Sequence, residues 1–211
     1  MKAVILISGN GSNLQSIIDN ADRIDLQISC VISNNKNAFG LKRAESSKLQ
    51  TAIIDPGLYN SKEVFDRELI SIIQKHGAEL IVLAGYMRVL TPLFVSHYFG
   101  KILNIHPSLL PKFPGLNTHQ RAINACEKVH GASVHFVTKE LDGGPLIYQD
   151  SVIIDNSDTE ETLSMKALKK EYEFLKKKYQ LQALDVVTWK TGKLRPANFP
   201  TIRIAQFVAF L

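Results

Sequence analysis

Short apolar runs alternate with amphipathic segments along the first half of the chain. The apolar runs predict strands over 3–7, 28–33, 51–54, 80–84 and 101–105. The segments between them predict helices over 12–20, 39–48, 62–76 and 92–97. Strands that alternate with helices indicate right-handed crossovers and a parallel sheet. Because the strands are apolar throughout, we expect both faces of this sheet to be covered.

The pattern changes after a predicted helix over 118–126. Two strand-like segments, 132–138 and 145–154, are separated only by the turn 139–144. This turn is too short for a helical crossover, so the two strands are expected to pair antiparallel and to make the sheet mixed. A last helix is predicted from near 158 to about 179, because acidic residues at its start favour a helix N-terminus. We expect one α/β domain over 1–211, in which 165–211 form an atypical C-terminal helix and tail.

Composition and charge narrow the class of protein. Hydrophobic residues make up 45% of the 211 positions, as in an ordinary globular protein, and no apolar run is long enough to cross a bilayer. The net charge of +5 suits anionic partners, but much of the excess lies in lysines of the last predicted helix, where we expect a solvated face. Aromatic residues do not interleave with these lysines in a stacking pattern, so a nucleic-acid surface is only weakly indicated, and neither a nucleic-acid nor a membrane partner is expected.

The cysteines indicate the compartment. Cys30 and Cys126 fall in a predicted strand and a predicted helix, where we expect both to be small buried apolar groups without a disulfide. This usage is typical of a reducing environment and predicts a cytoplasmic protein. Cys126, His130 and His135 have no recognised zinc-ligand spacing, so no metal is expected.

A turn with two glycines, Ser8–Asn13, joins the first predicted strand to the first predicted helix. Glycines let the backbone approach a ligand, and the first helical amides would then face an anion. Leu14 stands where a dinucleotide-binding fingerprint has its third glycine. The turn therefore favours a phosphate monoester, the alternative being a tight turn that binds no ligand.

Asn104 and His106 lie two positions apart at the end of an apolar run, just before Pro107. Side chains two apart in a strand project from the same face. An amide that binds an oxyanion and an imidazole that handles a proton would suit acyl transfer. Asp142, in a glycine-flanked turn, would supply a carboxylate to the histidine. The alternative is two polar residues that close a strand.

Several segments carry a family resemblance. They are Ser8–Asn13, Ala84–Arg88, Asn104–Pro111, Pro114–Gly115 with Thr118–His119, Ser133–Val137 and Leu141–Gly144. In order and spacing they closely resemble the phosphoribosylglycinamide formyltransferases, a folate-dependent formyltransferase family, over about residues 1–155. A methionyl-tRNA formyltransferase is expected to be longer at the C-terminus, and a formyltetrahydrofolate deformylase to carry an N-terminal regulatory domain.

The resemblance implies a single Rossmann-like formyltransferase domain and a reaction. The formyl group of 10-formyltetrahydrofolate would pass to the amine of 5-phosphoribosylglycinamide in de novo purine biosynthesis, without a metal. Asn104 and His106 would stabilise the oxyanion, and Asp142 would raise the pKa of His106. The partners would be these two small molecules, and the protein a monomer or homodimer. The alternatives are another folate-dependent formyl transfer or hydrolysis, and a non-catalytic nucleotide- or folate-binding module.

The resemblance also implies binding residues. Gly11, Ser12 and Asn13 would hold the substrate phosphate. The folate site would comprise Lys62, Met87, Arg88, Val89, Leu90, Asn104, Thr138, Lys139, Glu140, Leu141 and Asp142. Glu171 would contact the glycinamide, with Glu173 as the alternative and a solvated helix face as the plainer interpretation of both. A surface charge is the alternative for Arg88, and His135 is expected to be structural or to act behind the catalytic residues.

Overall fold

The computed structural model describes residues 1–177, without the side chains of 23–24 and 169–177. Within this range a seven-stranded sheet has the order β3-β2-β1-β4-β5-β6-β7. The strands are β1 (Lys2–Ile7), β2 (Gln27–Ser33), β3 (Thr51–Ile53), β4 (Leu80–Leu83), β5 (Ile102–His106), β6 (Val129–Phe136) and β7 (Leu146–Ile153). The first five are parallel, whereas β6 is antiparallel to both β5 and β7. The expected mixed sheet is confirmed.

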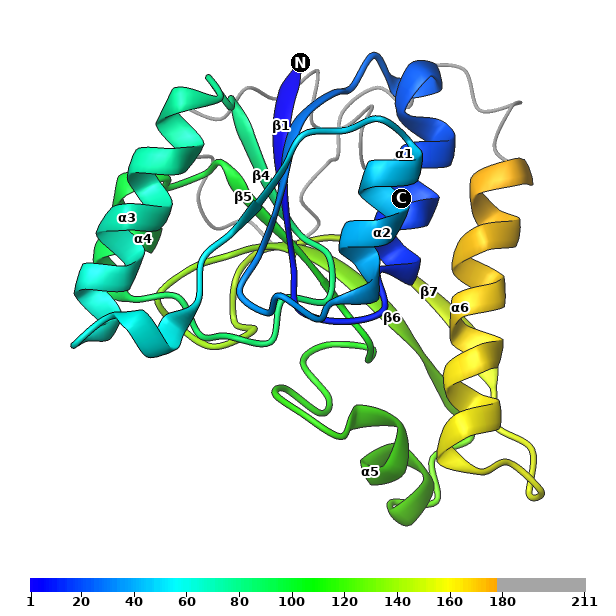
Figure 1. Cartoon of the computed structure of the whole chain (residues 1–211). Helices are drawn as coiled ribbons and strands as arrows, with labels where there is room; N and C mark the ends of the chain where they lie inside the picture. The colour runs from blue at the N-terminus through cyan, green and yellow to red at the C-terminus, as the bar shows by residue number, and fades with distance from the viewer. Residues whose placement is uncertain (178–211) are drawn as a thin grey trace.

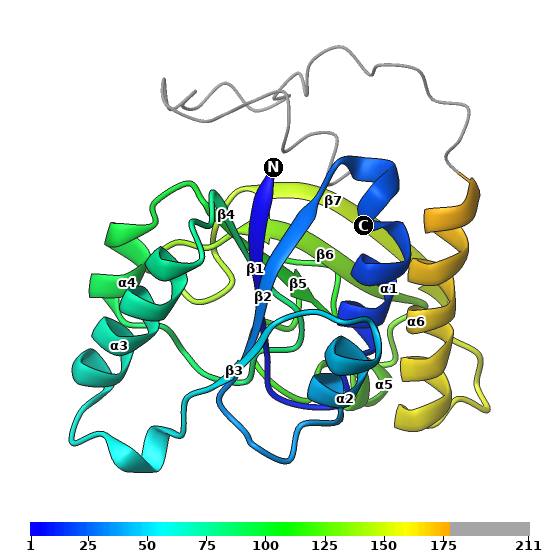
Figure 2. The same cartoon turned by 45° about the horizontal axis from the view of Figure 1, so that its top comes forward.

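Helices cover both faces of the sheet (Figure 1). They are α1 (Ser12–Asn20), α2 (Phe39–Ser46), α3 (Lys62–Lys75), α4 (Pro92–His97), α5 (Thr118–Asn124) and α6 (Glu160–Lys177). In Figures 1 and 2, α1, α2 and α6 lie on one side, and α3 and α4 on the other. Helix α5 lies beyond the end of the sheet. Two short 3₁₀ turns, η1 (Ala21–Ile24) and η2 (Pro56–Leu58), were not predicted from the sequence.

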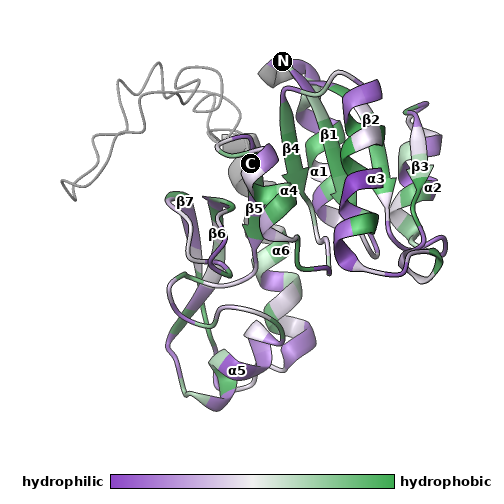
Figure 3. Ribbon diagram, turned by 90° about the vertical axis from the view of Figure 1, so that its left-hand side faces the viewer, coloured by the Kyte–Doolittle hydropathy of each residue, from purple (hydrophilic) through white to green (hydrophobic). Residues whose placement is uncertain are grey.

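The central strands alternate between two hydrophobic cores. In β1, Ile5 and Ile7 pack with the residues of α1 and α2, whereas Val4 and Leu6 pack with those of α3 and α4. All four side chains are fully buried, and the hydrophobic colour of the central strands is plain in Figure 3. A strand with both faces buried cannot show an apolar–polar alternation, which explains its continuous apolar sequence.

The predicted element boundaries agree closely with the structure. The helices predicted over 12–20 and 92–97 have these bounds, and the other elements differ by a few residues at their ends. Strand β6 differs most at its start, since it begins at Val129 instead of 132. The predicted end of the last helix near 179 lies outside the described residues, as does the rest of the tail.

The expectation for Cys126 is wrong. Cys30 is buried in β2, but Cys126 lies exposed just after α5. Its φ of 51° places it in the left-handed turn that ends this helix, so its side chain cannot continue the buried face of α5. In the part of the chain that the structure describes, no helix is long and apolar enough to span a membrane.

The strand order places the predicted site segments side by side. From β1 the chain builds the sheet outward through β2 and β3, and it then returns to add β4 on the other side of β1. Such a switch point leaves a crevice at the carboxyl ends of the strands, where open α/β sheets bind ligands. The segments that follow β1 and β4 and the end of β5 meet along this edge.

Candidate active site

Asn104 and His106 project from the same face of β5, because they are two residues apart in a strand. The antiparallel partner β6 places His135 directly opposite Asn104, and Ser133 opposite His106. Residues paired in this way share one face of the sheet. His106, Ser133 and His135 are buried, and Asn104 is half-buried. The strand pairing thus gathers four polar side chains at one site.

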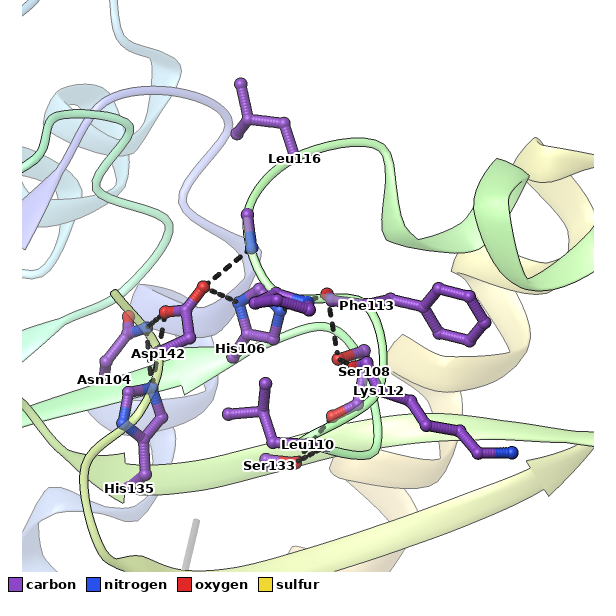
Figure 4. A network of polar contacts seen from close by, with 12 residues as sticks. Asn104, His106, Ser108, Leu110, Lys112, Phe113, Leu116, Ser133, His135 and Asp142 are labelled. Atoms are coloured by element: carbon purple, nitrogen blue, oxygen red, sulfur yellow. Dashed lines mark hydrogen bonds and ion pairs between the residues drawn. The ribbon is translucent and has the colours of Figure 1, made fainter. Parts of the chain in front are cut away.

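Asp142 completes this cluster from the turn between β6 and β7. One carboxylate oxygen, Oδ2, lies 3.5 Å from Nδ1 of His106 and accepts a hydrogen bond from the Gly115 amide at 2.8 Å. The other oxygen, Oδ1, accepts a hydrogen bond from Nδ2 of Asn104 at 3.4 Å. The structure therefore brings Asn104 and His106 each into contact with Asp142 (Figure 4).

The surroundings of Asp142 favour its ionised form. Burial acts to raise the pKa of this carboxyl, but the hydrogen bonds from His135 and from the Gly115 amide outweigh it, together with the charge of His106. The net effect holds the pKa of Asp142 below the usual value for aspartate. At neutral pH the site therefore contains a carboxylate that can orient its neighbours and stabilise a positive ring.

Both ring nitrogens of His106 face oxygen atoms. Nδ1 faces Asp142, and Nε2 lies 3.0 Å from the backbone carbonyl oxygen of Phe113. A carboxylate and a carbonyl are both acceptors, and an imidazole donates from both nitrogens only when it is protonated. The geometry around His106 therefore suits the imidazolium form.

His135 contacts Asn104 and Asp142 from β6, a position behind the predicted catalytic residues. Its Nδ1 lies 2.9 Å from the Phe136 carbonyl oxygen, which makes that nitrogen the donor in the neutral ring. Nε2 lies 3.1 Å from Nδ2 of Asn104 and 3.6 Å from Oδ1 of Asp142, so it accepts from the amide in the neutral ring and donates to the carboxylate in the protonated ring. With His135 neutral, Asn104 donates one hydrogen to His135 and one to Asp142. The signal for this role was the register across β5 and β6, which the sequence does not contain.

A fixed loop carries the Phe113 carbonyl group to His106. Ser108 Oγ donates to the carbonyl oxygen of Lys112 at 2.6 Å, and Ser133 Oγ donates to the carbonyl oxygen of Ser108 at 2.6 Å. The Leu110 amide in turn donates to Ser133 Oγ at 3.0 Å. These hydrogen bonds, seen in Figure 4, tie the loop to itself and to Ser133 of β6, and they explain the buried positions of Ser108 and Ser133.

The turn with two glycines, Ser8–Asn13, packs closely against α2. Gly11 has a φ of 75°, and a Cβ atom placed on it would lie 2.6 Å from the Cα of Gly40. The Gly40 amide donates to the carbonyl oxygen of Gly9 at 3.1 Å. Gly11 forms the N-cap of α1 without a side-chain hydrogen bond. Only glycine therefore fits at position 11 without a shift of the backbone. The first amides of α1, at Ser12 and Asn13, directly follow this position.

Arg43 of α2 forms hydrogen bonds with the same turn. Its Nε donates to the carbonyl oxygen of Asn10 at 2.9 Å, and a terminal nitrogen donates to the side-chain oxygen of Asn10 at 3.3 Å. Two contacts from one planar guanidinium fix both the position and the orientation of Asn10. The turn before α1 is thus held in one conformation.

The predicted folate residues come from three places in the fold. Met87, Arg88, Val89 and Leu90 follow β4, and Thr138–Leu141 lead into Asp142. Between α4 and the second of these segments lies a cleft of about 450 Å³, lined by Val95, Ser96, Phe99, Thr138, Lys139 and Glu140. Lys62 stands at the start of α3, where its side chain is exposed.

Arg88 is not a free surface charge. Its side chain is half-buried, and its guanidinium carbon lies 4.3 Å from the centroid of the Phe65 ring. This is the geometry of a cation–π contact. Glu171 and Glu173 belong to α6, which packs beside α1, but their side chains are outside the described part of the structure.

The histidines of the rejected zinc interpretation are engaged in other contacts. His130 is buried and its Nε2 lies 2.8 Å from Nδ1 of His119, whereas His135 belongs to the catalytic cluster. Burial, followed by the charge of His119, lowers the pKa of His130 to about 4. Among the residues that the structure describes, no three His, Cys, Asp or Glu side chains are placed to hold a metal ion.

Comparison with known proteins assigns this arrangement to a family. Residues 1–178 match the sequence profile of the formyl transferases. The chain belongs to the formyl transferase family. Residues 146–211 also match a family described as a protein of unknown function (DUF2851).

The sequence of this formyl transferase is similar to those of several named relatives. It is 48% identical over 174 residues to the phosphoribosylglycinamide formyltransferase of Escherichia coli (strain K12), a match that covers 82% of each chain. The Haemophilus influenzae enzyme of the same name is 44% identical, over 92% of this chain and 89% of the relative. The solved structure of phosphoribosylglycinamide formyltransferase from Coxiella burnetii is 48% identical and superposes with a TM-score of 0.78, over 82% of each chain.

Proposed function

We propose that this protein transfers the formyl group of 10-formyltetrahydrofolate to the amine of 5-phosphoribosylglycinamide, a step of purine biosynthesis, and that it does so in the cytoplasm. The observation that carries this proposal is the contact of Asp142 with both His106 and Asn104. It stands beside the turn with two glycines, Ser8–Asn13, and beside relatives named phosphoribosylglycinamide formyltransferase in a shared family.

Direct attack is the mechanism that the cluster suits. The amine nitrogen attacks the formyl carbon, and the carbonyl oxygen becomes anionic as the tetrahedral centre forms. Cleavage of the bond from that carbon to N10 then releases tetrahydrofolate, and the amine loses a proton as N10 gains one. No metal or covalent bond to the protein is needed.

His106 and Asn104 supply the hydrogen bonds that the oxyanion needs. In the imidazolium form His106 donates from Nε2, and the formyl oxygen would take the place of the Phe113 carbonyl oxygen on that nitrogen. Asn104 would donate one of the two amide hydrogens that it now gives to His135 and Asp142. A single well-placed donor to an oxyanion is typically worth about a hundred- to a thousandfold in rate.

Asp142 has a supporting role in this mechanism. Its carboxylate faces Nδ1 of His106, which fixes the ring and stabilises the positive charge as Nε2 donates. The hydrogen bond from the Gly115 amide fixes the carboxylate in turn. The ionised carboxylate of Asp142 therefore contributes by orienting His106 and by its negative charge, and it does not attack the substrate.

The two substrates would bind on either side of the catalytic cluster. Gly11, Ser12 and Asn13 would hold the phosphate through amides at the start of α1. The folate would bind between the segment Met87–Leu90 and the loop Thr138–Asp142, beside the cleft near α4. Lys62 would lie toward its carboxylates, and Glu171 would contact the glycinamide.

The deciding experiment mixes the purified protein with 10-formyltetrahydrofolate, with and without 5-phosphoribosylglycinamide, and follows the release of tetrahydrofolate. We expect release only when the glycinamide is present, with a formylated product of matching amount. Release that ignores the glycinamide would indicate hydrolysis and overturn the proposal. A His106→Ala protein is the control for contaminating activity.

A further inference from the structure

The segment after β4, Gly85–Thr91, is held near its start and at its end by side chains from other parts of the chain. We propose that Ser8 and Asp66 are positioning residues, which set the conformation of Gly85–Thr91 for folate binding. The inference rests on the proposed function, since it concerns how the same folate site is shaped. Neither residue is among the binding or catalytic residues that the sequence predicted, although Ser8 begins the turn expected to bind a phosphate.

Ser8 holds the start of the segment. Its hydroxyl oxygen accepts a hydrogen bond from the Met87 amide at 2.8 Å and donates to the side-chain oxygen of Asn34 at 2.6 Å. Its own amide donates to the carbonyl oxygen of Gly85 at 3.1 Å. Ser8 is only 8% exposed and begins the turn that leads to the predicted phosphate site. One hydroxyl thus links the phosphate turn to the folate segment.

Asp66 holds the other end. It lies in α3, is 1% exposed, and its Oδ2 accepts from both the amide and the hydroxyl of Thr91, at 2.7 and 2.6 Å. Thr91 in turn caps α4 through its hydroxyl, which accepts from the Phe94 amide at 3.4 Å. A buried carboxylate is costly unless its hydrogen bonds satisfy it. Its position here is explained by the two bonds that fix Thr91.

Three buried polar groups lie in or next to the segment Gly85–Thr91. Oδ1 of Asp66, the hydroxyl of Tyr86 and Nε of Arg88 are buried and have no hydrogen-bond partner among the described residues. Burial, followed by the charge of Asp66, raises the pKa of Tyr86, while the charge of Arg88 acts against it. The charges of Asp66 and Arg88 thus act in opposite directions on Tyr86.

Between the two held ends the backbone is available to a ligand. Within residues 1–177 the amides and carbonyl groups of Arg88, Val89 and Leu90 make no backbone hydrogen bond. A flat ring with donors and acceptors along its edge, such as a pterin, can pair with such a run only if the run keeps one shape. Loss of the hydrogen bonds from the segment to Ser8 or to Asp66 would let the segment change conformation. Folate binding would then weaken, while the catalytic cluster stays intact.

The test uses the full chain with Ser8→Ala and Asp66→Asn, and with Ser33→Ala as the matched control. Ser33 is also a buried serine at a strand end, and among residues 1–177 its hydroxyl bonds to the backbone of Asn35. For each protein we would measure kcat, KM for both substrates, the melting temperature, and the Kd for tetrahydrofolate by calorimetry.

We expect Ser8→Ala and Asp66→Asn each to raise the KM for 10-formyltetrahydrofolate and the Kd for tetrahydrofolate about five- to tenfold. The kcat and the KM for the glycinamide should stay within about twofold, and Ser33→Ala should match the wild type in every kinetic constant. Unchanged folate constants in both variants would overturn the inference. So would a loss of kcat and of both KM values together, in proportion to the melting temperature, because that pattern marks a merely structural role.

The two proposals fail in different ways. If the wild-type protein binds tetrahydrofolate but transfers no formyl group to the glycinamide, the proposed function is wrong, and the Kd comparison still decides the role of Ser8 and Asp66. If the wild-type protein transfers the group and neither variant changes the folate constants, only this inference is wrong. If the wild-type protein binds no tetrahydrofolate, both are wrong.

Discussion

Oδ2 of Asp142 lies 3.5 Å from Nδ1 of His106, while Oδ1 of the same carboxylate accepts a hydrogen bond from Asn104. One carboxylate thus orients both of the groups proposed to bind the oxyanion. It does so from a turn in which its own φ is 50°, a conformation that aspartate tolerates better than most residues. The glycines that follow it let this turn pass close to the rest of the chain, because a Cβ on Gly144 would collide with the carbonyl group of Phe136.

Replacement of His106 tests the proton donor. We expect His106→Ala to lower kcat about a hundred- to a thousandfold, because one oxyanion donor and the positive charge are lost. The KM for the glycinamide should change little, since its phosphate would bind at α1. Kinetics with saturating folate, beside a melting curve that shows a folded protein, measure this. Turnover near the wild-type value would remove His106 from the mechanism.

Replacement of Asp142 tests the orienting carboxylate. Asp142→Asn keeps the shape of the side chain and an acceptor for the Gly115 amide, but it loses the charge that faces Nδ1 of His106. We expect kcat to fall about a hundredfold, within the range for a positioned acid–base group, with a small change in melting temperature. A variant that keeps wild-type kcat across neutral pH would show that the carboxylate charge is dispensable.

Replacement of Gly11 tests the phosphate turn. Gly11→Ala would force a Cβ against Gly40 at a φ of 75°, so we expect a loss of stability of about 2 kcal/mol and a KM for the glycinamide raised at least tenfold. Gly9→Ala is the matched control, because nothing lies within 4 Å of its Cβ position. Denaturant titrations and initial rates measure both variants. Equal effects at the two glycines would contradict a specific role for Gly11.

The His119–His130 pair predicts how stability depends on pH. Burial lowers the pKa of His130 to about 4 in the folded protein, against 6.5 for an ordinary histidine. The unfolded chain therefore takes up a proton first, and stability present above pH 6.5 is lost as the pH falls toward 4, by a total on the order of 3 kcal/mol. Chemical denaturation from pH 7 to 4 measures this loss. His130→Asn should flatten the curve, and an equally steep curve in that variant would refute the assignment.

Much of the fold follows from local pattern. Each parallel strand is an apolar run with both faces buried, and each helix keeps its own apolar stripe, so the boundaries of α1 and α4 are readable in the sequence. The short turn before β7 predicts an antiparallel pair for the same local reason. Cys126 shows the limit of this reasoning, because the end of α5 places an apolar side chain on the surface.

The site is only partly readable in this way. Asn104 and His106 share a face because they are two apart in one strand, and this holds for any strand. The positions of His135, Ser133 and the Phe113 carbonyl group opposite them depend on which residues of β6 and of the following loop stand across from β5. Nothing local specifies that register.

The sequence by itself determined the elements, the mixed sheet and the residue types suited to formyl transfer, since these depend on side-chain periodicity and on chemistry within short segments. Only the tertiary structure decided that Asp142 reaches His106, that His135 pairs with Asn104, and that Ser8 and Asp66 hold the segment after β4. Contacts between segments far apart in the chain arise from strand order and packing against the common core, and no single stretch of sequence contains that information.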